Sequence, residues 1–465
     1  MRKIRLLIPL LLGMALFCSK QVETIGSDLL PGDAPEVVCQ GITRDIVEIS
    51  ADDAVKVAMM RGGSEKTKGA ATERTVKEVK TISSEDGVAN IYAVNYADDK
   101  GFTLVSATKN YFPVLAEVES GSFDDGIYET GAAVLLDQYN NDIEYCRTLP
   151  EDSLRRFRAL WREYEQKNEA KPKVTKDGDP LAVLISTSFA AWRAAGYEIY
   201  DLGGGAPEDL PQSVYDSWYS IAEGVANEDY DIDNNAFILR RRETIISERG
   251  PLMSTTWHQN PPYSNTAGSE LGCATIAAGQ IMKYHESPAC HNWSAMPNSL
   301  ASSTSGTTVL SDFLKNLGEY LGIDYSSGDS GVYIGVVKQK LNQDGYTCSL
   351  VTHNYFDSWC EVYAGYPIYM RGTRYIPQEE NHAWVCDGGR NTLLRETYTL
   401  MVISDVAPPL QWETPCDPYE YTEGNISLHM NWGWGGSANG WYVDNQNYAS
   451  VNYTYDRKDL IEIRP

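Results

Sequence analysis

The sequence predicts an α+β fold, because segments with the apolar spacing of helices alternate with short runs rich in β-branched and aromatic residues. Three segments of the first third have helical spacing: 52–60, 131–146 and 149–167. Three others are typical of strands: 90–96, 101–107 and 112–118. The first two strands are joined by the turn-forming sequence "ADDKG". A second α+β part is expected near the C-terminus, where a helical pattern is followed by aromatic, Gly-rich strands.

Changes in composition divide the 465 residues into four regions. Residues 1–18 are predicted to be a signal peptide, 40–170 an α+β domain, 171–249 a linker and activation region, and 250–465 the region that carries the chemistry. The third region is expected to be irregular and exposed, because "KPKVTKDGDP" and "DLGGGAPEDLPQ" are rich in charge, Pro and Gly.

The same region contains four arginines that are candidate sites of proteolytic activation: Arg240, Arg241, Arg242 and Arg249. A charged run is equally consistent with a solvated surface, so both interpretations stay open.

The charge and the cysteines exclude several classes of function. The net charge is −25 and the pI is about 4.6, so no nucleic acid partner is expected, because nucleic acid binding needs a cationic surface. The cysteines form no CxxC pair, so neither a metal nor another cofactor is expected. Besides Cys18 and Cys273 an odd number remains, which cannot all pair with one another: Cys39, Cys146, Cys290, Cys348, Cys360, Cys386 and Cys416.

The N-terminus is typical of an export signal. The basic "MRKIR" precedes "LLIPLLLGMALF", an apolar run too short for a permanent membrane span. Cys18 follows directly, which predicts lipid modification and a membrane tether; ordinary cleavage is the alternative, because Phe17 stands where lipoprotein signals carry a small residue. Both predict an exported bacterial protein, either extracellular or an outer-membrane lipoprotein.

Cys273 is the first candidate for chemistry. The residues after it that are small or apolar recur at helical spacing, which places Cys273 at the beginning of a buried helix: Ala274, Ala277, Ala278, Ile281 and Met282. A helix N-terminus favours the thiolate form of a cysteine, and Gly272 permits a backbone turn that a side chain would obstruct. A small buried core thiol is the alternative interpretation.

His382 is the candidate base. It lies in "HAWVCD", which is typical of a strand with His382, Trp384 and Cys386 on one face and a Gly-Gly stop after it. Beside the helix of Cys273 it would form an imidazolium–thiolate pair; a satisfied core histidine is the alternative.

Three further residues complete a candidate site. Asn431 could accept the imidazole N–H and fix its tautomer, and Trp432 could shield that bond from water. His429 shares the strand face of Asn431 and competes with it for this role. Gln259 could donate to an oxyanion together with the Cys273 backbone N–H.

Four motifs occur in one order along the chain: "WHQNPPYSN", "GCATIAAGQIMKYH", "NHAWVCDGG" and "HMNWGWGGSANGWY". Together they resemble the signature blocks of the streptopain family of secreted bacterial cysteine peptidases, which have a papain-like fold. The segment "YAVNYADDKGFTLVSATKNYFPVLAEVESGSF" is similar to the inhibitory pro-domain of that family. About two-thirds of the chain is covered by this resemblance.

The resemblance implies a cysteine endopeptidase made as a zymogen. Cys273 falls on the nucleophile, His382 on the general base and acid, and Gln259 on the oxyanion position. Asn431 and Trp432 fall on the positions that orient and shield the histidine. The expected partners are protein or peptide substrates and the chain's own pro-domain as an intramolecular inhibitor.

The chain departs from the family in three places. "ATI" follows Cys273 in place of the commoner "VAT", and the region 171–249 is longer than the family requires. Residues 390–425 separate the histidine strand from Asn431 by more than a hairpin, and this insertion is expected to overhang the cleft and alter specificity.

Two readings from other classes stay open: a binding protein that keeps the fold without catalysis, and a surface lipoprotein whose first domain inhibits a protease. Acyl or amide transfer on the same fold is a further enzymatic alternative.

Overall fold

The computed structural model describes residues 22–25, 42–43, 46–62, 74–124, 126–127, 131–165, 180–225, 235–326, 330–374, 380–404, 411–444 and 456–465. The predicted signal peptide and Cys18 lie outside these residues. The described part has helices packed on one large antiparallel sheet, so the predicted α+β class is confirmed.

The N-terminal domain, residues 42–165, is a four-stranded antiparallel meander with helices on both faces. Its strands are β2 (Val76–Ser83), β3 (Ala89–Tyr96), β4 (Phe102–Ser106) and β5 (Val114–Val118), and β1 (Val22–Ile25) pairs with β2. Alternate residues of β3 and β4 pack on α1 (Ala51–Gly62) and α2 (Ala132–Cys146), which therefore lie on opposite faces.

The helix expected at 149–167 is shorter than predicted. A 3₁₀ turn (Glu151–Leu154) leads into α3 (Arg155–Trp161). The chain then leaves the helix, because Tyr164 packs with Trp161 against α1 and Glu165 forms a β-bridge with Ile42.

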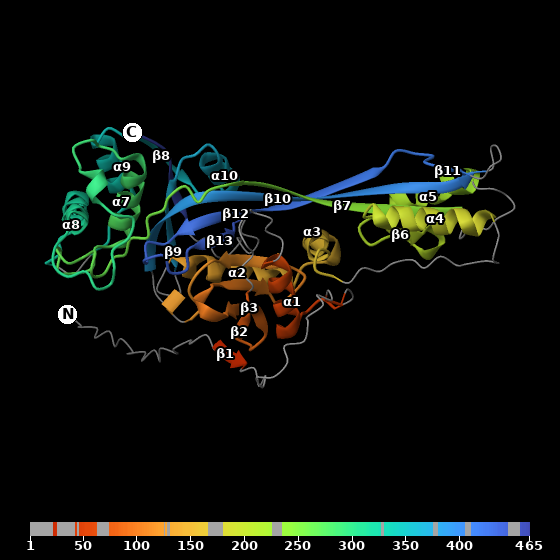
Figure 1. The fold of residues 1–465 in the computed structure, drawn as a ribbon, viewed down its shortest axis with the longest axis horizontal. Coiled ribbons are helices and arrows are strands. Elements are labelled where there is room, and N and C mark those ends of the chain that lie inside the picture. Colours follow the sequence, from red (N-terminus) through yellow and green to blue (C-terminus); the bar gives the residue numbers. More distant parts are fainter. Residues whose placement is uncertain are drawn as a thin grey trace, which may run out of the picture.

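A helical lobe forms one end of the molecule (Figure 1). It contains α7 (Cys273–His285), α8 (Val309–Leu321) and α9 (Ile334–Gln343). The apolar faces of these helices pack against the inner face of β9 (Ile368–Arg374), β10 (Glu380–Ser404) and β14 (Lys458–Arg464). The remaining elements at this end are β8 (Thr347–Thr352), which pairs with β14, and α10 (Tyr355–Tyr363).

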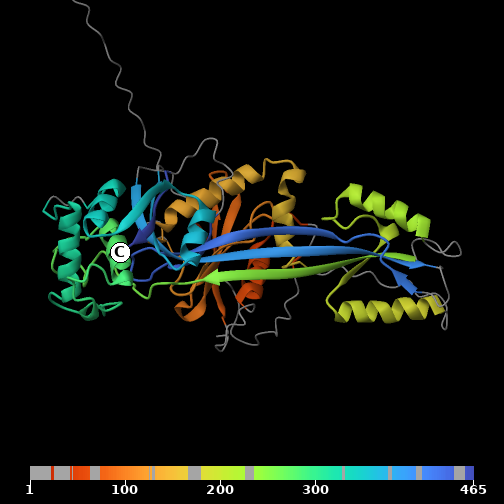
Figure 2. The same cartoon turned by 90° about the horizontal axis from the view of Figure 1, so that it is seen from above.

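Three long strands leave the body of the molecule as an arm. β10 pairs with β12 (Tyr419–Asn431) on one side and, from Gly389 onward, with β7 (Ala236–Arg249) on the other. The arm ends in a head made of α4 (Pro180–Ala194), β6 (Glu198–Asp201), α5 (Gln212–Val225) and β11 (Gln411–Glu413). Figure 2 shows α4 and α5 on either side of the strands, which agrees with their packing on alternate residues of β7 and β10.

Three expectations are therefore wrong. Within its described residues, the region 171–249 is not irregular: residues 180–225 and 235–249 form the head and a 14-residue strand. Arg240 is buried, at 3% exposure, where Glu198 binds its guanidinium, so it is not an accessible cleavage site. The insertion at 390–425 does not overhang the helical lobe, because it continues β10 and β12 toward the opposite end of the molecule (Figure 1).

The predicted Gly-Gly stop is a fourth error. Gly388 and Gly389 lie inside β10, where the register shifts at a bulge between Cys386 and Gly388. A Cβ on Gly388 would lie 2.8 Å from the Cβ of His429. These glycines therefore allow a close approach between strands rather than ending one.

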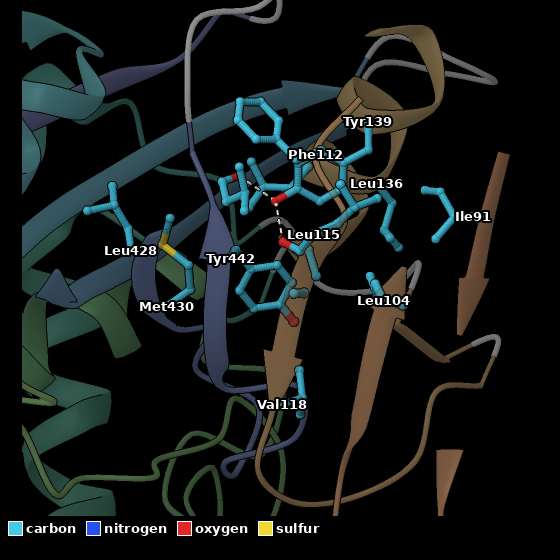
Figure 3. Close-up of a cluster of buried hydrophobic side chains, with 14 of the residues drawn as sticks. Ile91, Leu104, Phe112, Leu115, Val118, Leu136, Tyr139, Leu428, Met430 and Tyr442 are labelled. Carbon is cyan, nitrogen blue, oxygen red and sulfur yellow. Dashed lines mark hydrogen bonds between the residues drawn. The ribbon is translucent and has the colours of Figure 1, made fainter. Parts of the chain in front are cut away.

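The N-terminal domain shares its sheet and its core with the rest of the chain. β5 pairs with β13 (Gly440–Val443), which pairs with β12, so the sheet runs without a break from one domain into the other. Leu115 and Tyr139 of the first domain and Leu428 and Tyr442 of the second belong to one cluster of buried side chains, and Figure 3 shows Tyr442 beside Leu115. The Tyr139 hydroxyl donates to the carbonyl of Val443 at 2.5 Å. The two parts form one hydrophobic unit.

Each cysteine of the described residues is free: Cys146, Cys273, Cys290, Cys348, Cys360, Cys386 and Cys416. Among the described residues, no helix has the length and the apolar character that crossing a membrane would need.

Candidate active site

Cys273 is the first residue of α7, as predicted, and it is half-buried. Gly272 before it has φ +83°, and a Cβ there would lie 2.7 Å from the carbonyl oxygen of Ser330. Only glycine fits both this conformation and this contact. The residues expected on the inner face of the helix are all buried, which confirms the predicted core face: Ala274, Ala277, Ala278, Ile281 and Met282.

The surroundings of the thiol have opposing effects on its charge. Burial raises the pKa of the Cys273 thiol, and Glu270 raises it further. The backbone N–H groups of Ala383, Ala274 and Cys273 itself donate to the sulfur and lower the pKa, but burial outweighs them. In the full-length chain the thiol is therefore harder to ionise than a free cysteine.

His382 lies near the beginning of β10, opposite Gly372 of β9, and is half-buried. Because the N–H of the next residue, Ala383, reaches the Cys273 sulfur, the structure brings the histidine strand and the thiol together. Trp384 and Cys386 share one face of the strand, as predicted, and alternation assigns His382 to that face.

Gln259 is buried beside the cysteine helix. Its carbonyl accepts the N–H of Leu271, two residues before Cys273, at 3.0 Å. Its side chain is 4% exposed. The predicted oxyanion residue thus lies in a segment tied to the N-terminal end of α7.

Asn431 is the last residue of β12 and pairs with Val385 of the histidine strand. Its side-chain N–H groups donate to the Thr255 carbonyl at 2.7 Å and to Gln280 Oε1 at 3.3 Å. Its Oδ1 accepts from Gln280 Nε2 at 3.2 Å and from the N–H of Gly433 at 3.3 Å. These four bonds fill the donors and acceptors of the amide. They bind Asn431 to α7 and to the 255–259 segment, so its role toward His382 stays a prediction.

His429, the competing candidate, has a different partner. Its Nδ1 lies 2.6 Å from Asp387 Oδ1, and the second oxygen of Asp387 accepts the N–H of Met253 at 3.1 Å. This pair fastens the chain that leaves β7 to the histidine strand at the bulge itself, because Asp387 lies between Cys386 and Gly388.

Trp432 is fully buried at the predicted position. Its ring lies 5.0 Å from that of Trp384, on the face assigned to His382. Its Nε1 donates to the Ala438 carbonyl at 2.9 Å. This placement is compatible with a shield over the histidine.

The N-terminal domain covers this face. A Cβ on Gly131, which precedes α2, would lie 2.7 Å from Trp432 and 3.0 Å from Trp384. A Cβ on Gly372, the partner of His382 in the sheet, would lie 3.2 Å from Val134 of α2. The beginning of α2 is therefore packed against the strands that carry the candidate histidine and its tryptophan.

Gln280 is the residue of the site that the sequence analysis missed. It lies on α7, is 0% exposed and binds both Asn431 and the N–H of Trp257. A signal was present: Gln280 is a polar residue among the apolar positions of a helix predicted to be buried, and such a side chain needs a partner.

Two protein families match parts of the chain. Residues 47–143 match the family model of the Spi protease inhibitor, and residues 289–442 match that of the Peptidase C10 family. The predicted resemblance to the streptopain (C10) family and its inhibitory pro-domain is confirmed. The C10 match includes His382, Asn431 and Trp432 and begins after Gln259 and Cys273.

One solved structure similar to this chain is a fragment of prointerpain A from Prevotella intermedia. It shares 14% sequence identity, with 84% of this chain and 98% of that chain covered and a TM-score of 0.41. No curated protein matches the chain. The family matches support a cysteine-type peptidase whose N-terminal domain is an intramolecular inhibitor.

Proposed function

We propose that the chain is an exported cysteine endopeptidase that is made as a zymogen. The observation that carries the proposal is the position of Cys273, at the beginning of α7, where its sulfur accepts the N–H of the residue next to His382. Covalent peptide hydrolysis requires a thiol and an imidazole. Here the backbone of His382 adjoins the thiol, and alternation turns its side chain to the face of β10 opposite the Ala383 face that packs with Cys273, so the imidazole has to turn toward the thiol on activation.

The reaction would proceed through a thioester. The Cys273 thiolate attacks the peptide carbonyl carbon, and the carbonyl electron pair moves to oxygen, where Gln259 and the Cys273 N–H stabilise it. Collapse breaks the C–N bond, and the imidazolium of His382 gives its proton to the leaving amine. His382 then removes a proton from water, which attacks the thioester and releases the acid and the thiol.

Trp432 and Asn431 would support this chemistry without taking part in it. Trp432 excludes water from the face of His382, as its packing on Trp384 suggests. Asn431 is proposed to orient the histidine, either directly after activation or through the position of β12.

Latency would follow from the packing of α2 and β5 on the peptidase. Because α2 lies against the strands of His382 and Trp432, a substrate must compete with the chain's own N-terminal domain. The raised pKa of Cys273 in the untrimmed chain also opposes thiolate formation. Since the head and β7 are folded onto β10, the first cut of activation is proposed within residues 166–179, ahead of α4, with release of the N-terminal domain as the step that follows it.

Export is proposed from the N-terminal signal alone. Lipid modification at Cys18 would tether the enzyme to a membrane, and a Cys18→Ser variant would then be released into the medium. Retention of that variant in the membrane fraction would contradict the tether.

The proposal predicts that Cys273→Ala removes peptide hydrolysis. Turnover of a peptide substrate by the trimmed enzyme should fall at least about 10³-fold, because no other group replaces the nucleophile. Cys290→Ala is the matched control, since this exposed cysteine is free and should be dispensable. Undiminished turnover by Cys273→Ala, with normal folding, would refute the assignment.

A further inference from the structure

Gln280 occupies an unusual place in the helix of the nucleophile. It is completely buried, on a helix whose other inner residues are apolar or small. It follows Cys273 by seven residues, which corresponds to two turns and about 10 Å along the helix axis. Its side chain therefore does not touch the reacting atoms.

The amide of Gln280 binds two separate parts of the site. Oε1 accepts the N–H of Trp257 and a side-chain N–H of Asn431, both at 3.3 Å. Nε2 donates to Asn431 Oδ1 at 3.2 Å, so the two amides form a reciprocal pair. Asn431 also reaches the Thr255 carbonyl at 2.7 Å, which closes a ring around the 255–257 backbone.

The same segment leads to Gln259, two residues beyond Trp257. Gln259 in turn accepts the N–H of Leu271, just ahead of Cys273. The contacts thus connect the middle of α7, through residues 255–259, with the N-terminus of α7. Any shift at Gln280 is passed to Gln259 and to the end of β12.

We propose that Gln280 is a positioning residue for the reaction, whose buried amide fixes the Gln259 segment and Asn431 relative to the helix that carries Cys273. This inference rests on the proposed function and goes beyond it, since it assigns a role to a residue outside the reacting groups. An apolar side chain of the same length would leave the Trp257 N–H and part of the Asn431 amide unpaired in a dry interior.

The first test compares Gln280→Met with wild type after trimming, with rates normalised to the amount of titratable Cys273. We expect kcat to fall on the order of 10- to 100-fold with KM nearly unchanged. The reason is that a misplaced oxyanion donor stabilises the transition state less, whereas it contributes little to the binding of the substrate. The rate of Cys273 alkylation by iodoacetamide should change little, because alkylation needs no oxyanion donor.

Ile281→Val is the matched control. Ile281 is the next residue of α7 and equally buried, and its shortening loosens the helix packing without touching the amide pair. If Ile281→Val lowers the normalised kcat as much as Gln280→Met, the role of Gln280 is only structural and the inference is wrong.

Gln280→Glu gives an independent test if Gln280→Met fails to fold. The introduced carboxylate can accept from Trp257 but cannot donate to Asn431 Oδ1, whereas the protonated carboxyl can. Burial raises the pKa of such a carboxyl. We therefore expect kcat relative to wild type to recover as the pH falls. If the ratio of kcat in Gln280→Glu to kcat in wild type does not change with pH, the inference is wrong.

These outcomes are distinguishable from failure of the proposed function. A trimmed wild-type enzyme without turnover would refute the function and the inference together. Normal wild-type turnover, with an unaffected kcat in Gln280→Met, would refute the inference alone.

Discussion

At the residue scale, the untrimmed chain raises the pKa of its candidate nucleophile, Cys273. Cys273 has the helix N-terminus and three backbone N–H donors that a thiolate needs, yet burial keeps the pKa of the thiol raised. Glu270 adds a negative charge with the same effect. Formation of an ion pair with His382 is the change that activation must supply.

Alkylation of Cys273 should report this difference directly. In the untrimmed chain, the rate of reaction with iodoacetamide should be low at pH 7 and rise into the alkaline range, because only the thiolate reacts and its pKa is raised. After trimming, the reaction should extend to acidic pH. Stopped-flow or mass-spectrometric rates measure both profiles, and identical profiles before and after trimming would contradict the account.

His353 offers a second residue-scale prediction, about stability. Burial and Arg457 lower the pKa of His353, but contacts with Asp459 at 2.7 Å and Asp444 at 3.2 Å outweigh them and raise it to about 9. A folded-state pKa above the unfolded value near 6.5 means that the protonated form stabilises the fold. This contribution is complete below about pH 6.5 and disappears as the pH rises through about 9.

His353→Gln should therefore lower the free energy of unfolding more at pH 6 than at pH 10. Urea titrations of both proteins at the two pH values measure the difference. An equal loss at both pH values would show that folding does not raise the pKa of His353.

At the element scale, the arm holds the N-terminal domain at a second place, far from the active-site strands. Arg162, at the end of α3, contacts Asp209 of the head at 2.6 Å, and both side chains are 5% exposed. Arg155 donates to the Asp209 carbonyl at 2.9 Å. Together with the β5–β13 pairing, this contact fastens the domain at both ends.

Cutting within residues 166–179 should thus leave the N-terminal domain bound. Arg162→Ala should weaken the retention of the N-terminal domain by about 3 kcal/mol. This value is the low end for a broken buried ion pair, because Arg240 remains 3.8 Å from Asp209 and still compensates its charge. Gel filtration of the cut protein measures the dissociation. Arg158→Ala is the control, since Arg158 of the same helix binds Asn110 within its own domain. Equal release of the N-terminal domain in the two variants would show that the contact between Arg162 and Asp209 does not retain it.

Local sequence patterns predicted the helices and strands that bury one face. The elements that form only through long-range pairing could not be predicted in this way. The helices that begin near 52, 131 and 273 and the strands around 90–118 were recognised, because apolar spacing is a local property. β7 was missed, since its C-terminal half, residues 241–249, carries charges of both signs and forms a strand by pairing with β10. In the site, the positions of Cys273 and Gln259 followed from motifs, whereas the bonds of Gln280 depend on three segments that meet only in the fold.

At the scale of the whole molecule, inhibitor and peptidase are parts of one sheet. The order of strands runs from β2 to β5 of the N-terminal domain directly into β13, β12 and β10. Buried side chains from both parts form a common core (Figure 3). Activation therefore has to separate a continuous sheet and expose apolar surface, so a single backbone cut is not expected to be sufficient.

The central claim is that this chain is a latent cysteine peptidase with Cys273 as its nucleophile. The most direct measurement is mass spectrometry of the signal-free chain after incubation with an irreversible thiol-directed peptide inhibitor, before and after limited trypsin treatment and removal of the N-terminal domain. The account predicts one adduct, on Cys273, only in the trimmed protein. No adduct in either state, or an adduct on Cys273 formed equally fast in the untrimmed chain, would contradict it.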